Sequence, residues 1–363
     1  MRRSQRGYSS YRGRRTLTDV LKIVAAVLGV LAVVLLVAVW IGGKDGLPLK
    51  LPDVSQQDGG QPDASTGGQE DDQSGGTGSE SGQEEPDTSQ PEQPEEPEQE
   101  SVMTALELPV SAILDGTAAA QLEQAGANAL VLTMKDEEGM LAWNSQQALA
   151  QSYGVNAGDE TVQQQLQAWN QGEVYTVARV CCFRDNTIPY HRNDLAMRAS
   201  YGNWRDEKGL RWLNPASEGA REYLAGLCGE LAAMGFDEIL LECAGFPTAG
   251  SVDRITSGAG EQAQAVSAFV ELVEQAVAPY GTKISLRAEA GVLTGELPEC
   301  GITTALLSGL EGRIWMVSGT EPALQALLTQ AGVTDGEGRL VEIVPQLEQD
   351  SAVPQAKLLD ETT

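Results

Sequence analysis

The chain has 363 residues and a formal net charge of -28, because 52 Asp and Glu residues outnumber 24 Lys and Arg residues. This charge repels nucleic acid and anionic polymers at long range, so we expect no nucleic-acid partner, whereas a neutral glycan or a protein partner remains compatible. One histidine and an odd number of cysteines argue against a metal cluster and a Ser-His-Asp catalytic group. With no phosphate-binding glycine-rich loop either, we expect no cofactor.

The first 43 residues predict a membrane anchor. Residues 1–22 are rich in Arg, and Ile23 to Gly43 form an uninterrupted apolar run. About 20 apolar residues span the hydrocarbon core as one helix, and this run is too long for the apolar region of a cleaved signal peptide. The flanking positive charge predicts a cytoplasmic amino terminus. We therefore expect a single-pass protein of the cell membrane, with the tail at 1–22, the helix at 23–43 and the main domain outside the cytoplasm.

Residues 44–101 are predicted to be an acidic, disordered linker. From residue 51 onwards the segment consists almost entirely of Asp, Glu, Gln, Ser, Gly, Pro and Thr, with no Lys or Arg. Such a segment buries too little apolar surface to offset its ordering entropy, and its like charges repel one another. Its position between anchor and domain favours a spacer over an acidic binding tail.

Strand-like apolar runs alternate with amphipathic helical runs over residues 102–363. The predicted strands are Val110–Leu114, Ala129–Met134, Val174–Phe183, Glu238–Leu241, Lys283–Ala288, Ile302–Leu307, Arg313–Val317 and Leu340–Val344. The predicted helices are Ala118–Gln124, Thr161–Asn170, Ser217–Met234, Ala263–Val277 and Pro322–Gln330. This alternation predicts an α/β domain with a parallel sheet. Eight strands permit a closed (β/α)8 TIM-type barrel, although the short last three leave an incomplete barrel open.

The run Glu238–Leu241 predicts a buried strand at the centre of this domain. It begins after Gly235 and ends before Gly245 and Pro247, which are residues typical of turns. Glu242 follows at the carboxyl end of the strand. In α/β barrels that end carries the catalytic side chains, whereas the opposite end mainly serves stability. Glu242 is therefore a candidate site residue.

The same segment resembles a known family. Gly235 to Pro247 (GFDEILLECAGFP) is similar to the F-D-E-I-x-x-D-Y-x-R-F-P signature of a bacterial family of glycoside hydrolase-like domains of unknown function, related to α-amylase-type enzymes. Four further matches follow the family's order: Met134 to Gly139, Ala178 to Asp185, Trp204 to Asp206 and Trp212 to Pro215. Together they span roughly 110–287. The resemblance implies an α-amylase-like barrel and glycoside hydrolysis.

The chain departs from the family at the positions that carry chemistry. Glu242 replaces an Asp, and Cys243 and Gly245 replace a Tyr and an Arg. Thr133 and Arg287 both stand where the family has Asp. The residues that form the scaffold therefore match the family better than the residues that would carry the chemistry. Two hypotheses follow: a glycoside hydrolase acting on a cell-envelope or extracellular polysaccharide, and an inactive module that binds a glycan or a protein partner at the cell surface.

Four carboxylates follow predicted strands. They are Asp136, Asp185, Glu242 and Glu289. Glycoside hydrolysis needs two carboxyl groups. The resemblance to α-amylase-type barrels implies a nucleophile after the fourth strand and an acid after the fifth, which points to Glu242 and Glu289. We predict Asp136 and Asp185 as substrate-binding residues. Alternatively, all four are ordinary polar residues at strand ends.

The long segment from Asp185 to Asn214 is rich in aromatic residues. Flat apolar rings with polar edges stack on sugars, so we predict that Tyr201 and Trp204 bind substrate. For Trp212 we expect that the ring pins the loop to the barrel, and for His191 a solvated loop position.

The five cysteines are predicted to be structural. Cys181, Cys182, Cys228, Cys243 and Cys300 lie mostly in apolar runs, where a free thiol behaves as a small buried hydrophobe. One intramolecular disulfide also remains compatible with the sequence.

Overall fold

The computed structural model describes residues 102–258, 260–318, 324–333 and 338–359. The predicted tail, membrane helix and linker, at 1–101, lie outside these ranges. Among the residues that are described, no helix is long and apolar enough to cross a membrane.

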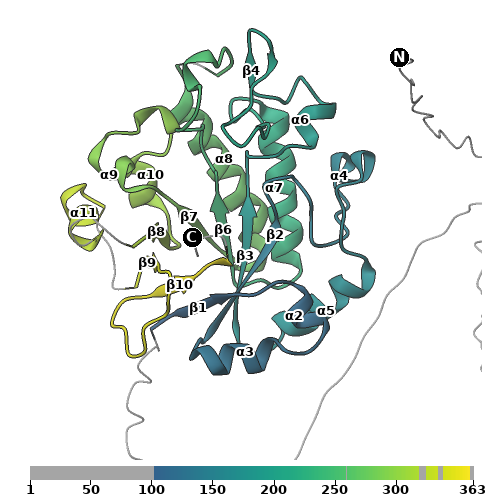
Figure 1. Cartoon of the computed structure of the whole chain (residues 1–363), viewed down its shortest axis with the longest axis vertical. Helices are drawn as coiled ribbons and strands as arrows, with labels where there is room; N and C mark the ends of the chain where they lie inside the picture. Colours follow the sequence, from purple (N-terminus) through teal and green to yellow (C-terminus); the bar gives the residue numbers. More distant parts are fainter. Residues whose placement is uncertain (1–101, 259, 319–323, 334–337, 360–363) are drawn as a thin grey trace, which may run out of the picture. The chain divides into compact units, whose positions relative to one another are not determined.

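Eight parallel strands close into a barrel, with chain order kept around the circumference (Figure 1). They are β1 (Thr104–Glu107), β2 (Ala129–Lys135), β3 (Tyr175–Cys181), β6 (Glu238–Glu242), β7 (Lys283–Arg287), β8 (Ile314–Val317), β9 (Leu340–Ile343) and β10 (Gln355–Lys357). Strand β1 pairs with both β2 and β10, which completes the circle. The predicted α/β barrel is confirmed, and it is closed rather than incomplete.

Helices surround the barrel, and a small hairpin lies at one end. The longer helices are α3 (Ala118–Ala125), α5 (Glu160–Asn170), α7 (Glu218–Ala233), α8 (Gln262–Val277) and α11 (Leu324–Gln330). The short ones are α2 (Ser111–Leu114), α4 (Ala148–Tyr153), α6 (Ile188–His191), α9 (Ala290–Thr294), α10 (Thr304–Gly309), η1 (Val252–Arg254), η2 (Ala278–Tyr280) and η3 (Pro298–Cys300). Helix α7 packs against β6 and α8. Strands β4 (Arg198–Ala199) and β5 (Gly202–Asn203) form the hairpin at the top of Figure 1.

Two of the predicted strands are wrong. The run 110–114 contains α2, and the run 302–307 leads into α10, which Thr303 caps by accepting a hydrogen bond from the Leu306 N–H. A short apolar run has too few residues to distinguish a strand from a helix by periodicity. The sequence pattern did not predict β1 and β10, which have only four and three residues. Because β1 replaces the wrong first strand, Glu242 still ends the fourth strand of the barrel.

Alternate strand residues form two apolar layers. Val177 and Leu240 belong to the cluster that fills the barrel interior. Ala178 and Ile239, their sequence neighbours, belong to the larger cluster that includes the helices. Since side chains alternate along a strand, residues two positions beyond the interior ones also face inward. That alternation places polar side chains above the apolar filling, at the carboxyl ends of the strands.

Candidate active site

A cavity of about 1140 Å³ lies at the carboxyl ends of the barrel strands. Its lining includes residues at or near the carboxyl ends of several strands, among them Glu107, Thr133, Arg179, Glu242, Arg287, Val317 and Leu359. Ligand pockets for small molecules occupy about 300–1000 Å³, so this cavity has room for a larger ligand. It occupies the end of the barrel at which barrel enzymes bind and transform substrates.

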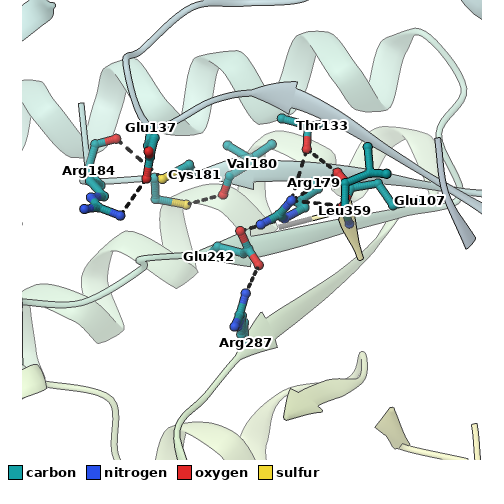
Figure 2. Close-up of polar contacts among 11 residues, drawn as sticks. Glu107, Thr133, Glu137, Arg179, Val180, Cys181, Arg184, Glu242, Arg287 and Leu359 are labelled. Carbon is teal, nitrogen blue, oxygen red and sulfur yellow. Dashed lines mark hydrogen bonds and ion pairs between the residues drawn. The ribbon is translucent and has the colours of Figure 1, made fainter. Parts of the chain in front are cut away.

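Four charged side chains of alternating sign form the floor of this cavity (Figure 2). Arg179 Nη1 lies 3.0 Å from Glu107 Oε2, and Arg179 Nε lies 2.7 Å from Glu242 Oε2. Arg287 Nη1 lies 2.8 Å from Glu242 Oε1. Three of them are the last residues of β1, β6 and β7, Arg179 lies two residues before the end of β3, and their formal charges cancel. We call Glu107, Arg179, Glu242 and Arg287 the charged floor.

Glu242 is held at both of its oxygens. Its residue is only 5% exposed, and each carboxylate oxygen accepts a charge-assisted hydrogen bond from a different guanidinium group. The family signature has an Arg at the position of Gly245, and this chain lacks that guanidinium group. The structure shows that Arg179 and Arg287 orient Glu242 instead, from the neighbouring strands.

Arg179 and Glu107 were not predicted as site residues from the sequence. Glu107 is buried and accepts hydrogen bonds from the Thr133 hydroxyl and the Leu359 N–H as well as from Arg179. Burial alone would lower the pKa of Arg179, but the carboxylates of Glu242 and Glu107 raise it. A sequence signal did exist, because Arg179 interrupts an apolar strand two residues after the interior Val177.

Glu289 lies on the same cavity as Glu242. It follows β7, occupies the N-cap position of α9 and is exposed. The Thr248 hydroxyl donates a hydrogen bond of 3.1 Å to Glu289 Oε1. The structure thus brings the two predicted catalytic carboxylates to the ends of adjacent strands and to one cavity.

The two predicted binding aspartates have different surroundings. Asp136 lines the cavity, its Oδ1 accepts hydrogen bonds from the N–H groups of Glu138 and Met140, and burial raises its pKa. Asp185 is completely buried and is absent from the cavity lining. Its Oδ2 lies 3.1 Å from Lys135 Nζ, so in this structure it anchors the buried ammonium group rather than facing a ligand.

Of the three aromatic residues singled out in the sequence, the structure brings Trp212 to the cavity but not Tyr201 or Trp204. Trp204 is fully buried, and its Nε1 donates to the Ser251 carbonyl at 2.9 Å. Tyr201 is 59% exposed in the turn of the β4–β5 hairpin and does not line the cavity. Trp212, expected to be only a structural pin, lines the cavity and also packs edge-to-face on Trp204. The path of an irregular loop decides which ring faces the cavity, and such a loop has no residue periodicity from which that direction could be predicted.

We expect Trp204→Ala to destabilise the domain more than Trp212→Ala does. Removing a fully buried aromatic side chain costs about 3–5 kcal/mol through lost burial and the remaining cavity, whereas Trp212 already has one side on the pocket. Urea unfolding followed by fluorescence measures both free energies of unfolding. Equal losses in the two variants would show that the rings have the same role.

The single histidine lies outside the cavity lining. His191 is exposed, as expected, but it ends the short helix α6 rather than lying in a loop, and its ring stacks on Tyr153 with 4.7 Å between ring centroids. Within the described ranges of the chain, no group of three or more His, Cys, Asp and Glu side chains is placed to hold a metal ion.

The protein is an α/β barrel of eight parallel strands, with a carboxylate-lined cavity at the carboxyl ends of the strands, where barrel enzymes carry their active sites. Residues 111–295 match the family model described as "Putative glycosyl hydrolase domain", and the chain belongs to this family. The match includes Arg179, Glu242, Arg287 and Glu289, whereas Glu107 precedes it. The family predicted from the sequence is therefore confirmed.

Solved structures with a similar fold come from several organisms. A hypothetical protein from Ruminiclostridium thermocellum ATCC 27405 is 21% identical, with a TM-score of 0.43, and the match covers 50% of this chain and 96% of that one. The PgaB (BpsB) glycoside hydrolase domain from Bordetella bronchiseptica is 12% identical, with a TM-score of 0.46 and coverage of 67% and 84%. GH20 exo beta-N-acetylglucosaminidase from Vibrio harveyi is 10% identical, with a TM-score of 0.46 and coverage of 72% and 46%. No curated protein matches the sequence.

Proposed function

We propose that the barrel hydrolyses a glycosidic bond, with Glu242 as nucleophile and Glu289 as acid and base. The observation that carries this proposal is the presence of both carboxyl groups on one cavity at the ends of the adjacent strands β6 and β7. Glycoside hydrolysis uses one carboxylic acid to protonate the leaving oxygen and a second carboxylate to attack the anomeric carbon or to activate water.

The surroundings of the two carboxyl groups suit these different roles. The charged floor fixes Glu242 in one orientation, as a nucleophile requires for attack along a defined line. Glu289 is exposed, so its proton exchanges with solvent between the two steps. Trp212 offers an aromatic surface for a sugar ring, and the Asp136 carboxyl group accepts hydrogen bonds from sugar hydroxyls.

We propose a neutral cell-envelope or extracellular polysaccharide as the substrate and the cell membrane as the location. Support comes from the acidic chain, which repels polyanions, and from the apolar run at 23–43 behind an Arg-rich tail. On intact cells, an added protease is expected to release a fragment that begins within the linker at 44–101. A barrel that stays protected until the cells are lysed would place the domain on the cytoplasmic side.

A binding module without turnover is the second candidate. It is favoured by the contact between Arg287 and Glu242, because a second guanidinium group on the carboxylate withdraws electron density from the attacking oxygen. Arg287 stands where the family signature has Asp, so a chain that keeps the Asp cannot form this contact with the carboxylate. Such a module would hold a glycan or a protein partner at the cell surface.

A panel of neutral envelope and extracellular polysaccharides separates the candidates. Reducing-end release by the full-length protein is the result expected of a hydrolase, with calorimetric titration as the parallel binding measurement. Saturable binding without release identifies the glycan-binding module. Neither binding nor release across the panel removes both carbohydrate functions and leaves a protein partner.

A further inference from the structure

Two cysteines lie beside Glu242 on the cavity. Cys181 is the Cα partner of Glu242 in the parallel pairing of β3 with β6, and Cys243 is the next residue after Glu242. Both cysteines belong to the cavity lining, and both are free thiols. Cys181 is buried and Cys243 is half-buried, but both border the cavity, whereas Cys182 and Cys228 do not.

The backbone of Cys243 accounts for this arrangement. In a regular strand the residue after Glu242 would point away from the barrel interior, as Leu241 does. Cys243 instead has a φ of 46°, in the left-handed region that residues other than Gly seldom adopt. This turn brings its side chain to the cavity side next to Cys181. Unusual backbone conformations of this kind concentrate at functional sites.

The spacing of the two cysteines suits a covalent bridge. Neighbouring strands lie about 4.8 Å apart, and one residue of stagger brings the expected Cα separation to about 6 Å. Disulfides span Cα separations of about 4.4–6.8 Å. A hydrogen bond with Cys243, together with burial, raises the pKa of the Cys181 thiol, and Cys181 Sγ also donates to the Arg184 carbonyl at 3.6 Å.

We propose that Cys181 and Cys243 form a redox pair that closes to a disulfide when a low-molecular-weight disulfide enters the cavity. The Cys243 thiolate attacks one sulfur of the small disulfide, forms a mixed disulfide and releases one thiol. Cys181 then loses its proton and attacks the Cys243 sulfur, which releases the second small thiol. Two protein thiols are oxidised and one small disulfide is reduced to two thiols. The bridge ties the ends of β3 and β6 on either side of Glu242.

The other cysteines provide matched controls. Cys182 and Cys228 are fully buried among the residues between barrel and helices. Neither of them lines the cavity, so a small disulfide that enters the cavity does not reach their sulfur atoms. Cys300, on η3, also lines the cavity. It tests whether Cys243 pairs with Cys181 in particular or with any thiol that borders the cavity.

The test uses the full-length protein, reduced and then exposed to oxidised glutathione near neutral pH. The wild-type chain is expected to lose two of its five thiols, counted after denaturation, and to yield a crosslinked peptide pair containing Cys181 and Cys243. Cys182→Ser is expected to keep the crosslink, whereas Cys181→Ser is expected to stop at glutathione bound to Cys243. Circular dichroism confirms that each variant is folded.

Three results would overturn the redox pair. They are five unchanged thiols in the wild-type chain, a crosslink between Cys243 and Cys300, and a crosslink that persists in Cys181→Ser. Because the wild-type peptide map requires no variant, a variant that fails to fold does not obscure the outcome. The measurement is also independent of glycan turnover, so it stands whichever proposed function holds.

Discussion

Replacing Glu242 by Gln is expected to lower glycan turnover by several orders of magnitude, on the order of 10⁶-fold where loss of a catalytic nucleophile has been measured. The amide keeps the shape of the side chain but cannot form the covalent glycosyl intermediate. It also weakens two charge-assisted hydrogen bonds in the charged floor, so we expect a stability loss of about 1–3 kcal/mol. Initial rates of reducing-end release, measured well below the thermal midpoint of the variant, give the effect on turnover.

Glu107→Gln is the matched control for that variant. It breaks the other ion pair of Arg179 within the same charged floor but leaves both proposed catalytic carboxylates in place. We expect a comparable stability loss with a decrease in turnover of at most about 100-fold, as is usual when a group that orients a functional residue is lost. If Glu107→Gln lowers turnover as much as Glu242→Gln, the effect belongs to the network and Glu242 loses its special role.

Replacing Asp185 by Asn is expected to destabilise the domain by about 3–5 kcal/mol, because it leaves a buried ammonium group without its counter-charge. Lys135 Nζ also donates to the carbonyls of Cys181, Cys182 and Arg184, but neutral carbonyl oxygens compensate less of the charge. On balance the Asp185 carboxylate raises the pKa of Lys135 against the opposing effect of burial. Urea unfolding measures the loss.

A double-mutant cycle isolates the ion pair from the rest of the site. Lys135→Met removes the ammonium group, and Lys135→Met combined with Asp185→Asn removes both charges. We expect the double variant to be more stable than the sum of the two single losses implies, because neither charge is then left alone. Additive losses would mean that the two side chains act separately, despite the 3.1 Å between their charged atoms.

The sequence predicted the middle strands of the domain better than its first and last strands. Strand β6 was found because its apolar run lies between Gly235 and Gly245, and a long amphipathic helix precedes it. Strands β1 and β10 were not predicted because each has too few residues to show a strand pattern. Their pairing with each other is seen only in the closed barrel. The strand count nevertheless stayed correct up to Glu242, since the wrong first strand stood next to the real one.

The sequence predicted the site residues that directly follow apolar strands. It did not predict the residues that reach the site through contacts between neighbouring strands of the barrel. Glu242 and Glu289 directly follow apolar runs, so sequence position alone located them. The partners of Glu242 come from β3 and β7, and only the closed sheet shows that Arg179 and Arg287 reach the same carboxylate. The choice between Trp204 and Trp212 depends on an irregular loop, for which no residue spacing predicts direction.

The most direct measurement is a search for a covalent glycosyl adduct on Glu242. With Glu289→Gln, breakdown of the intermediate is slowed, so turnover of an aryl glycoside with a good leaving group, stopped with acid, should leave a glycosyl mass on the peptide containing Glu242. The aryl leaving group removes the need for an acid in the first step. Glu242 as nucleophile predicts that adduct together with retained configuration at the anomeric carbon. A glycosyl mass on another carboxylate, or products of inverted configuration with no adduct, would contradict it.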